Sequence, residues 1–341
     1  MTDTNEGPGE DATGEQSASP PGSSRVLTVS RRVIPWIGTV LIFAYIFYRV
    51  PIRDVLDSFH LVRPVIFISL YTIQFVIFFN MDALAHYLVF NWFNAKTGWV
   101  EVFFARGATY ILSLLNYFVG QGGIGFWLAR KKNVSATEAT SSIVFLLFMD
   151  LFSLILFASI GVMFLLEDVK LTDFFSLKSE GHLVRFTLIT LVVMLFQVSI
   201  WLSRTEAPLA RWLLFRGPFL VFGRALGSQF AILLLVKVGI FLSDVLFTWL
   251  LLKSFGIDIP LMLVFTYLPL IYLIGSIPIT VFHLGTTQAA YIWFFKDFAE
   301  PEVLIAFSLL INFMMPLTRT VAGSLCLRRV SRELFAKIES G

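Results

Sequence analysis

The sequence predicts an all-α membrane protein that crosses the bilayer several times. Hydrophobic residues make up 57% of the 341 residues, only 14% are charged, and the mean hydropathy is +0.80. A soluble domain carries about 25% charged residues and cannot hide so much apolar surface. The apolar residues also occur in eight runs, each near the roughly 20 residues that a bilayer-spanning helix needs. We therefore expect about eight transmembrane segments.

The apolar runs set the expected domain boundaries. Residues 1–30 are expected to form a disordered cytoplasmic tail, because their acidic composition, rich in Gly, Ser and Pro, buries too little apolar surface to order a chain. Residues 31–335 are the expected membrane domain, and 336–341 a C-terminal tail. Within the domain, residues 204–224 carry four arginines and are typical of a helix on an anionic membrane surface. The apolar runs are 34–50, 64–86, 99–120, 138–166, 183–203, 226–252, 260–280 and 302–327.

Two of these runs contain residues that interrupt a helix. Four glycines lie between Gly120 and Gly125, and each glycine inside a helix costs about 1 kcal/mol relative to alanine. The second interruption, 276–285, contains Pro278 and Gly285. Irregular backbone within a bilayer is tolerated only where protein or a water-filled cavity satisfies its polar groups. The pattern predicts two broken or re-entrant helices that line a site.

The distribution of basic residues favours re-entrant hairpins. If all eight runs cross the membrane, 12 basic residues lie on the N-terminal side and 11 on the other. If 99–130 and 260–296 are hairpins that enter from opposite sides, 15 lie on the N-terminal side and 8 on the other. Because cytoplasmic loops carry an excess of Lys and Arg, the second arrangement is favoured, with both termini in the cytoplasm. Two hairpins of opposite orientation also indicate an inverted repeat with a site near the midplane.

Both interruptions resemble motifs of a known family. Asn116, the glycine run and the stretch from Leu128 to Ala139, with its basic cluster and a serine before the next helix, resemble the flippase-like membrane domain of lysylphosphatidylglycerol synthases. The stretch from Pro278 to Tyr291 resembles the second signature of that family, which is a proline, a glycine-rich turn and a short helix. The resemblance extends over residues 30–335. It implies a domain of eight helices that handles lipids.

The sequence departs from the family pattern at three points. Val119-Gly120 stands where the family has Pro-Gly, His283 replaces a customary glycine, and Gln288 replaces a glutamate. Since no soluble segment follows Lys337, a fused aminoacyl transferase is expected to be absent, and the chain is not expected to be an enzyme. The resemblance implies a location in the bacterial inner, cytoplasmic membrane.

Ionisable side chains inside the apolar runs are the first candidates for a lipid-headgroup site, because such residues are costly in a bilayer. Arg106 and Arg319 can make bidentate contacts with phosphate oxygens. Lys237 and Asp244 lie two turns apart on one helix face. Asp150 is a further intramembrane polar residue, and we expect Arg106 or Arg319 to pair with it. For all five residues, structural ion pairing is the competing explanation.

Polar residues and glycines at the interruptions are the second set of candidates, because they can bind freed backbone or headgroup oxygens. For the histidine in this set, a hydrogen-bonded packing role is the alternative. A separate cluster of Asn80, Asp82 and His86 is interpreted as the interfacial end of the second apolar run. The second set is Asn116, Gln121, Gly122, Gly123, Gly125, Pro278, His283, Gly285 and Gln288.

Several classes of function are not supported by the sequence. No nucleotide-binding motif or catalytic triad is present, so we assign no catalytic residue and no cofactor. Cys326 is the only cysteine and the four histidines are scattered, which argues against a metal site. The basic residues form no stripe for nucleic acid.

The predicted function is binding and translocation of a phospholipid or a polyprenyl-linked glycolipid across the membrane. Membrane lipids and a lipid-modifying transferase are the expected partners. Two alternatives remain open: a non-catalytic subunit that presents lipid to a separate transferase, and a secondary transporter of a small solute.

Overall fold

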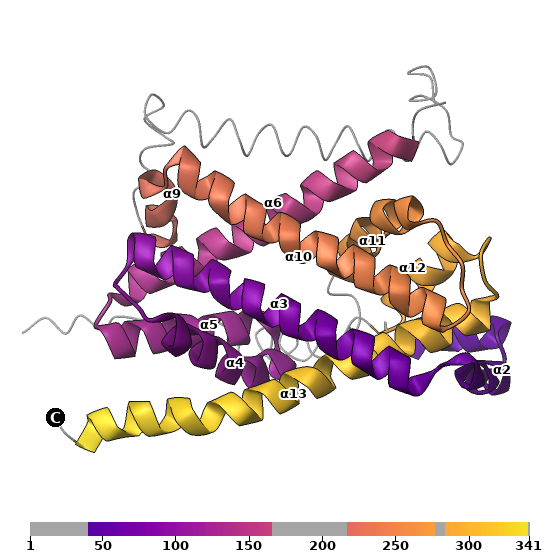
Figure 1. Ribbon diagram of the computed structural model, residues 1–341, viewed down its shortest axis with the longest axis horizontal. Coiled ribbons are helices and arrows are strands. Elements are labelled where there is room, and N and C mark those ends of the chain that lie inside the picture. The colour runs from indigo at the N-terminus through magenta and orange to yellow at the C-terminus, as the bar shows by residue number, and fades with distance from the viewer. Residues whose placement is uncertain (1–39, 166–216, 277–283, 340–341) are drawn as a thin grey trace, which may run out of the picture.

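The computed structural model describes residues 40–165, 217–276 and 284–339, and all regular structure in these ranges is helical (Figure 1). Short helices connect or flank the longer ones: α2 (Ile52–Ser58), α9 (Leu220–Arg224) and the 3₁₀ turns Phe59–Leu61 and Gly217–Phe219. The predicted segment 183–203 and most of the predicted surface helix 204–224 lie outside the described residues, as does the N-terminal tail.

Four long helices form the frame of the molecule. They are α3 (Pro64–Phe93), α6 (Ala136–Leu165), α10 (Gly227–Ser254) and α13 (Pro301–Glu339). Each contains a stretch long and apolar enough to cross a membrane. A shorter apolar helix, Val40–Arg49, occupies part of the first predicted segment. The protein is thus an all-helical, multi-pass membrane protein.

The first predicted hairpin is present as α4 (Trp99–Leu115) and α5 (Tyr117–Lys132), of 17 and 16 residues. Asn116 between them is extended, at φ −165° and ψ 140°, and its side chain accepts a hydrogen bond from the backbone N–H of Phe118. The open ends of the two arms are joined, because Lys132 Nζ lies 2.7 Å from Glu101 Oε2. This hydrogen bond lowers the pKa of the Glu101 carboxyl below its usual value. The two arms therefore return to the same end of the molecule.

The glycines of the first hairpin do not break the helix, which corrects the sequence-based prediction. The break lies at Asn116, and the glycine run lies inside α5. A Cβ atom on Gly120 would overlap Ser113 Oγ and approach the Ser113 Cα to 3.0 Å. A Cβ on Gly123 would come within 2.6 Å of Leu112 Cδ1. Gly120 and Gly123 are therefore contact residues that let α4 and α5 pack closely, as small residues do between membrane helices.

The second hairpin consists of α11 (Leu261–Ser276) and α12 (Thr286–Phe295). The described end of its predicted interruption, Leu284 and Gly285, is a turn before α12, whereas Pro278 and His283 fall outside the described residues. Gly285 precedes α12 at φ +92°, in the left-handed region that favours glycine. Its N–H donates to Gln288 Oε1 at 2.6 Å, which caps the start of the helix.

The two hairpins are attached at opposite ends of the frame (Figure 1). At the left edge of the view α3 ends, the first hairpin begins and α6 starts; at the right edge α10 ends, the second hairpin follows and α13 starts. Each hairpin also has its own buried apolar cluster. One includes Ile124 and Trp127 of α5, and the other includes Tyr291 and Phe295 of α12.

Candidate headgroup site

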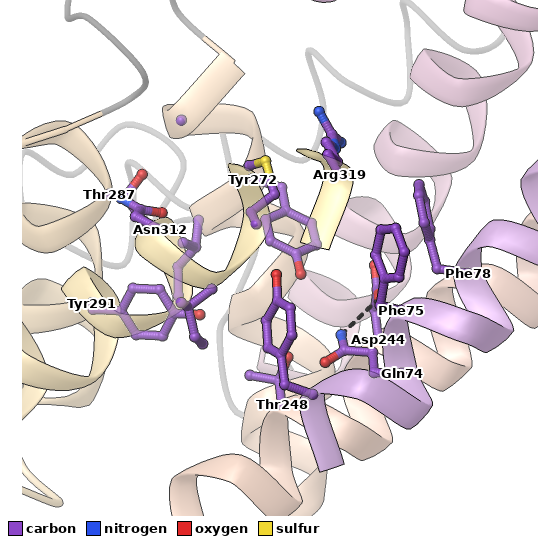
Figure 2. A pocket seen from close by; sticks show the side chains of 15 residues that line it. Gln74, Phe75, Phe78, Asp244, Thr248, Tyr272, Thr287, Tyr291, Asn312 and Arg319 are labelled. Carbon is purple, nitrogen blue, oxygen red and sulfur yellow. Dashed lines mark hydrogen bonds between the residues drawn. The ribbon is translucent and has the colours of Figure 1, made fainter. Parts of the chain in front are cut away.

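Two adjoining cavities are lined by polar and charged side chains inside the bundle. The larger, of about 320 Å³, is named the tyrosine cavity (Figure 2). The smaller, of about 230 Å³, is named the ion-pair cavity. The tyrosine cavity is lined by Tyr71, Gln74, Phe75, Phe78, Asp244, Thr248, Ile271, Tyr272, Gly275, Thr287, Tyr291, Ile311, Asn312, Met315 and Arg319. The ion-pair cavity is lined by Phe78, Asp82, Arg106, Tyr110, Ser113, Tyr117, Asp150, Lys237, Ile240 and Arg319.

Asp82 of α3 is the centre of the first ion pair. Its Oδ2 atom accepts a hydrogen bond from Arg106 Nε at 2.6 Å and another from Tyr110 OH at 2.8 Å. Arg106 is only 3% exposed, and its Nη1 atom has no hydrogen-bond partner in the structure. The Arg106 guanidinium is thus paired with Asp82 through Nε, and its Nη1 group can still donate a hydrogen bond inside the protein.

This arrangement overturns the interpretation of Asn80, Asp82 and His86 as an interfacial helix end. Helix α3 continues to Phe93, and Asp82 and His86 are buried within the bundle. His86 Nδ1 lies 2.8 Å from the backbone oxygen of Asp82. Only Asn80 is exposed, and it donates to its own helix at Val76 O. The sequence shows a polar cluster near the end of an apolar run, but it does not show that Arg106 of α4 packs against it.

Asp150 and Lys237 form the second ion pair, between α6 and α10. The prediction that Asp150 pairs with Arg106 or Arg319 is therefore wrong. Tyr117 OH also donates to Asp150 Oδ2 at 3.3 Å. Lys237 is 4% exposed, so this cation is buried beside its carboxylate. The pair fixes two long helices that are far apart in the sequence.

Gln121 is the one predicted residue of α5 that belongs to this network. Its Nε2 donates to Tyr117 OH at 3.0 Å, and its Oε1 lies 3.3 Å from His86 Nε2. A Cβ on Gly122 would meet nothing within 4 Å, whereas one on Gly125 would lie 3.2 Å from Ile143 Cγ1. Gly122, Gly123 and Gly125 line neither cavity, and neither does Asn116, which caps α5.

The tyrosine cavity contains fewer charges. Asp244 of α10 accepts a hydrogen bond from Gln74 Nε2 of α3 at 3.0 Å (Figure 2). Tyr71, Tyr272 and Tyr291 line the same cavity from three different helices. Gly285 and Gln288 lie at the start of α12, where they shape the backbone without lining the cavity.

Arg319 of α13 and Phe78 of α3 line both cavities. The Arg319 guanidinium lies 5.8 Å from the ring centroid of Tyr110, and within the described residues it makes no ion pair with a carboxylate. Asp82 and Asp150 are already neutralised by Arg106 and Lys237. The junction of the two cavities therefore presents a cation without a carboxylate partner.

Sequence reasoning missed most of the uncharged lining residues. Tyr71, Gln74 and Phe78, together with Asp82, recur every three to four residues along α3 and so share one face. That spacing is a signal the sequence does contain, because polar residues interrupt an otherwise apolar helix on a single side. The lining residues from α11, α12 and α13 carry no comparable signal. In the described parts of the chain, no three His, Cys, Asp or Glu side chains gather in a group that could hold a metal ion.

The fold and the two cavities define a multi-pass helical membrane protein with polar, partly charged space inside its bundle. The family model for the lysylphosphatidylglycerol synthase TM region matches residues 33–323, so the chain belongs to that family. This confirms the resemblance in the sequence and relates the protein to lipid handling. No curated protein matches the chain.

Proposed function

We propose that the protein binds the phosphate-bearing headgroup of a membrane lipid at Arg319 and moves the lipid across the bilayer. The observation that carries this proposal is the position of Arg319, which lines both cavities and has no carboxylate partner in the described residues. A guanidinium can bind two phosphate oxygens at once, and in a site with little water this contact is stronger than at a surface. The free Nη1 donor of Arg106 adds a second contact for an anion in the ion-pair cavity.

The opposed hairpins support movement rather than binding alone. Arms α11 and α12 line the tyrosine cavity, whereas α4 and α5 line the ion-pair cavity. Because the hairpins are attached at opposite ends of the frame (Figure 1), each cavity is associated with one end. We infer an inverted repeat in which a headgroup passes from one cavity to the other past Phe78 and Arg319.

An apolar groove beside the tyrosine cavity suits the lipid chains. It has a volume of about 460 Å³ and lies between the helix Val40–Arg49 and the second hairpin, with Leu41, Ile274 and Trp293 in its walls. Its residues Thr286 and Ala290 alternate along α12 with Thr287 and Tyr291 of the tyrosine cavity. One helix thus separates space for a polar head from space for an apolar tail, as a phospholipid or polyprenyl-linked glycolipid requires.

The proposal includes no chemical step, and the protein is proposed to act without catalysis. It is further proposed to lie in the cytoplasmic membrane with both termini in the cytoplasm. The basic residues near the first hairpin support this orientation, because Lys96, Arg130–Lys132 and Arg224 lie at the end of the frame where α3 ends. A lipid-modifying transferase in the same membrane is the proposed protein partner.

Transbilayer movement of labelled lipid in proteoliposomes tests the function. Acyl-labelled fluorescent phospholipids, one anionic and one zwitterionic, are bleached from the outer leaflet, and the protected fraction is followed over time. The protein is expected to raise the rate of movement above that of protein-free vesicles. Arg319→Ala is expected to lower that rate at least about tenfold, the effect of losing one charge-assisted hydrogen bond. Arg53→Ala, an exposed arginine on α2 outside both cavities, is the matched control.

The outcomes separate the alternatives. Movement no faster than in empty vesicles, for every headgroup, overturns the proposal. A transferase that co-purifies with an inactive protein identifies a lipid-presenting subunit instead. Ion-coupled uptake of a water-soluble solute, without lipid movement, identifies a small-solute transporter.

A further inference from the structure

Asp244 and Gln74 form a pair whose hydrogen bonding is incomplete. Gln74 Nε2 donates to Asp244 Oδ1 at 3.0 Å, but Gln74 Oε1 is buried and has no hydrogen-bond partner. No Lys, Arg or His in the described residues lies within ion-pair distance of Asp244. The carboxyl group therefore differs from Asp82 and Asp150, each of which has its own cation.

A proton on Asp244 completes this pair. A carboxylic acid and a primary amide can make two hydrogen bonds in a ring: the acid O–H donates to the amide oxygen, and the amide N–H donates to the acid carbonyl. Protonated Asp244 would thus donate to Gln74 Oε1, the atom that lacks a partner. The ionised carboxylate instead leaves that oxygen unsatisfied and places a charge without a contacting cation within the bundle, and both are costly.

Within the described residues, the other groups that face Asp244 include no cation at ion-pair distance. They are Tyr71 on α3, Tyr272 on α11, Tyr291 on α12 and Arg319 on α13. The three tyrosines are uncharged, and Tyr71 interacts electrostatically with both Asp244 and Arg319. Lys237, two turns away on α10, is engaged by Asp150. With Asp244 ionised, the charges of the tyrosine cavity sum to zero; with Asp244 protonated, the cavity has the net positive charge of Arg319.

We propose that Asp244 is a proton-binding site, and that its protonation is coupled to the binding of an anionic headgroup in the tyrosine cavity. The inference rests on the proposed function and names a driving force for it. The carboxylate takes one proton from water as the anion binds, and returns one proton to water as the anion leaves. No electron is transferred and no covalent bond between heavy atoms changes. A proton gradient would then favour headgroup binding from the more acidic side.

Proton uptake on binding is the first test. Dihexanoyl-phosphatidylglycerol, a short-chain anionic phospholipid, is titrated calorimetrically into the full-length protein in detergent, in two buffers of different ionisation enthalpy. The wild type is expected to take up as much as about one proton per bound lipid at pH values where Asp244 is ionised in the free protein, and there its affinity is expected to fall by up to about tenfold per pH unit. Asp244→Asn, which keeps the shape and the bond with Gln74, is expected to bind without proton uptake and independently of pH. Asp244→Glu is expected to restore the uptake.

Infrared spectroscopy supplies a readout that requires no lipid. A carbonyl band of a buried, protonated carboxyl is expected to titrate in the wild type and to be missing in Asp244→Asn. Asp258→Asn removes an exposed carboxyl outside both cavities and is the matched control, in which the band is expected to remain. A titrating band that persists in Asp244→Asn overturns the proposal.

The calorimetric results distinguish this inference from the proposed function. Lipid binding without proton uptake overturns the coupling and leaves lipid binding at Arg319 intact. Absence of lipid binding at every pH overturns both.

Discussion

The two hairpins have the same overall plan but hold their polar residues in different ways. The cavity of the first hairpin contains two ion pairs, the buried Arg106–Asp82 pair and the Lys237–Asp150 pair, in which the lysine is buried and the carboxylate partly exposed. The cavity of the second contains Asp244, which has only an amide partner. Paired charges hold helices in one arrangement, whereas an unpaired group can change its protonation or bind a ligand. We therefore expect the ion pairs of the first cavity to hold helices together, and Asp244 in the second cavity to be the group that changes its protonation.

The two hairpins also differ in how closely their arms pack. In the first, Gly120 and Gly123 allow the arms α4 and α5 to touch, and there is no space for a Cβ atom on Gly120. In the second, a Cβ on Gly275 would lie 3.6 Å from Thr287 Oγ1, an ordinary contact distance. The first hairpin is thus closely packed along its arms, and the second leaves space where its arms face each other.

Removal of one carboxylate from each cavity is expected to give the largest difference in stability between variants of the two hairpin cavities. Asp82→Ala leaves Arg106 buried and without a counter-charge, which is expected to cost about 3–5 kcal/mol of stability. Asp244→Ala breaks one hydrogen bond to Gln74 and is expected to cost no more than about 1–3 kcal/mol. Unfolding of both variants in detergent, followed by scanning fluorimetry, measures the difference.

The double variant Asp82→Ala/Arg106→Met is the control for this pair, because it removes both charges together. It is expected to recover part of the stability lost in Asp82→Ala. Equal destabilisation by Asp82→Ala and Asp244→Ala would contradict the distinction between the cavities.

Alanine substitutions at matched glycines are expected to show a smaller difference. Gly120→Ala forces α5 away from Ser113 and is expected to destabilise the protein by about 1–3 kcal/mol. Gly275→Ala is expected to be neutral, or to stabilise by up to about 1 kcal/mol, because alanine favours a helix and the site has space. The same unfolding assay measures both. A cost at Gly275 as large as that at Gly120 would show that the arms of the second hairpin are as closely packed as those of the first.

The smallest expected effect is the pH dependence of the stability that the Glu101–Lys132 pair adds at the open end of the first hairpin. The hydrogen bond from Lys132 lowers the pKa of Glu101 in the folded protein. Its stabilising contribution is therefore complete above the pKa of the unfolded chain, and is lost as the pH falls through the lowered, folded-state value. Because both side chains are partly exposed, the contribution is expected to stay below about 1 kcal/mol.

Glu101→Gln removes this titration without a large change in shape. The difference in stability between the wild type and Glu101→Gln is expected to shrink in acid and to persist at neutral pH. A difference that grows as the pH falls would have the wrong sign and would exclude this role for the pair.

Many features of the fold were predictable because they depend on local properties of the chain. An apolar run of about 20 residues spans a bilayer wherever it occurs, and so the starts of α3, α6, α10 and α13 lie within two residues of the predicted ones. Charged residues in such runs need partners or a cavity, and Arg106, Asp150, Lys237, Asp244 and Arg319 all line one of the two cavities. The cost of a charge in lipid is the physical reason why these charged residues face a cavity.

A helical membrane protein with two interrupted hairpins and a few costly intramembrane charges can be predicted from the sequence alone. Which of these charges pair is visible only in the packed structure, because pairing depends on helix crossings such as that of α6 with α10. The packed structure also decided that Gly120 and Gly123 are contact residues, since a glycine at a break and a glycine at a close contact have the same side chain. That Arg319 and Asp244 make no ion pair within the described residues is likewise a property of the packed bundle.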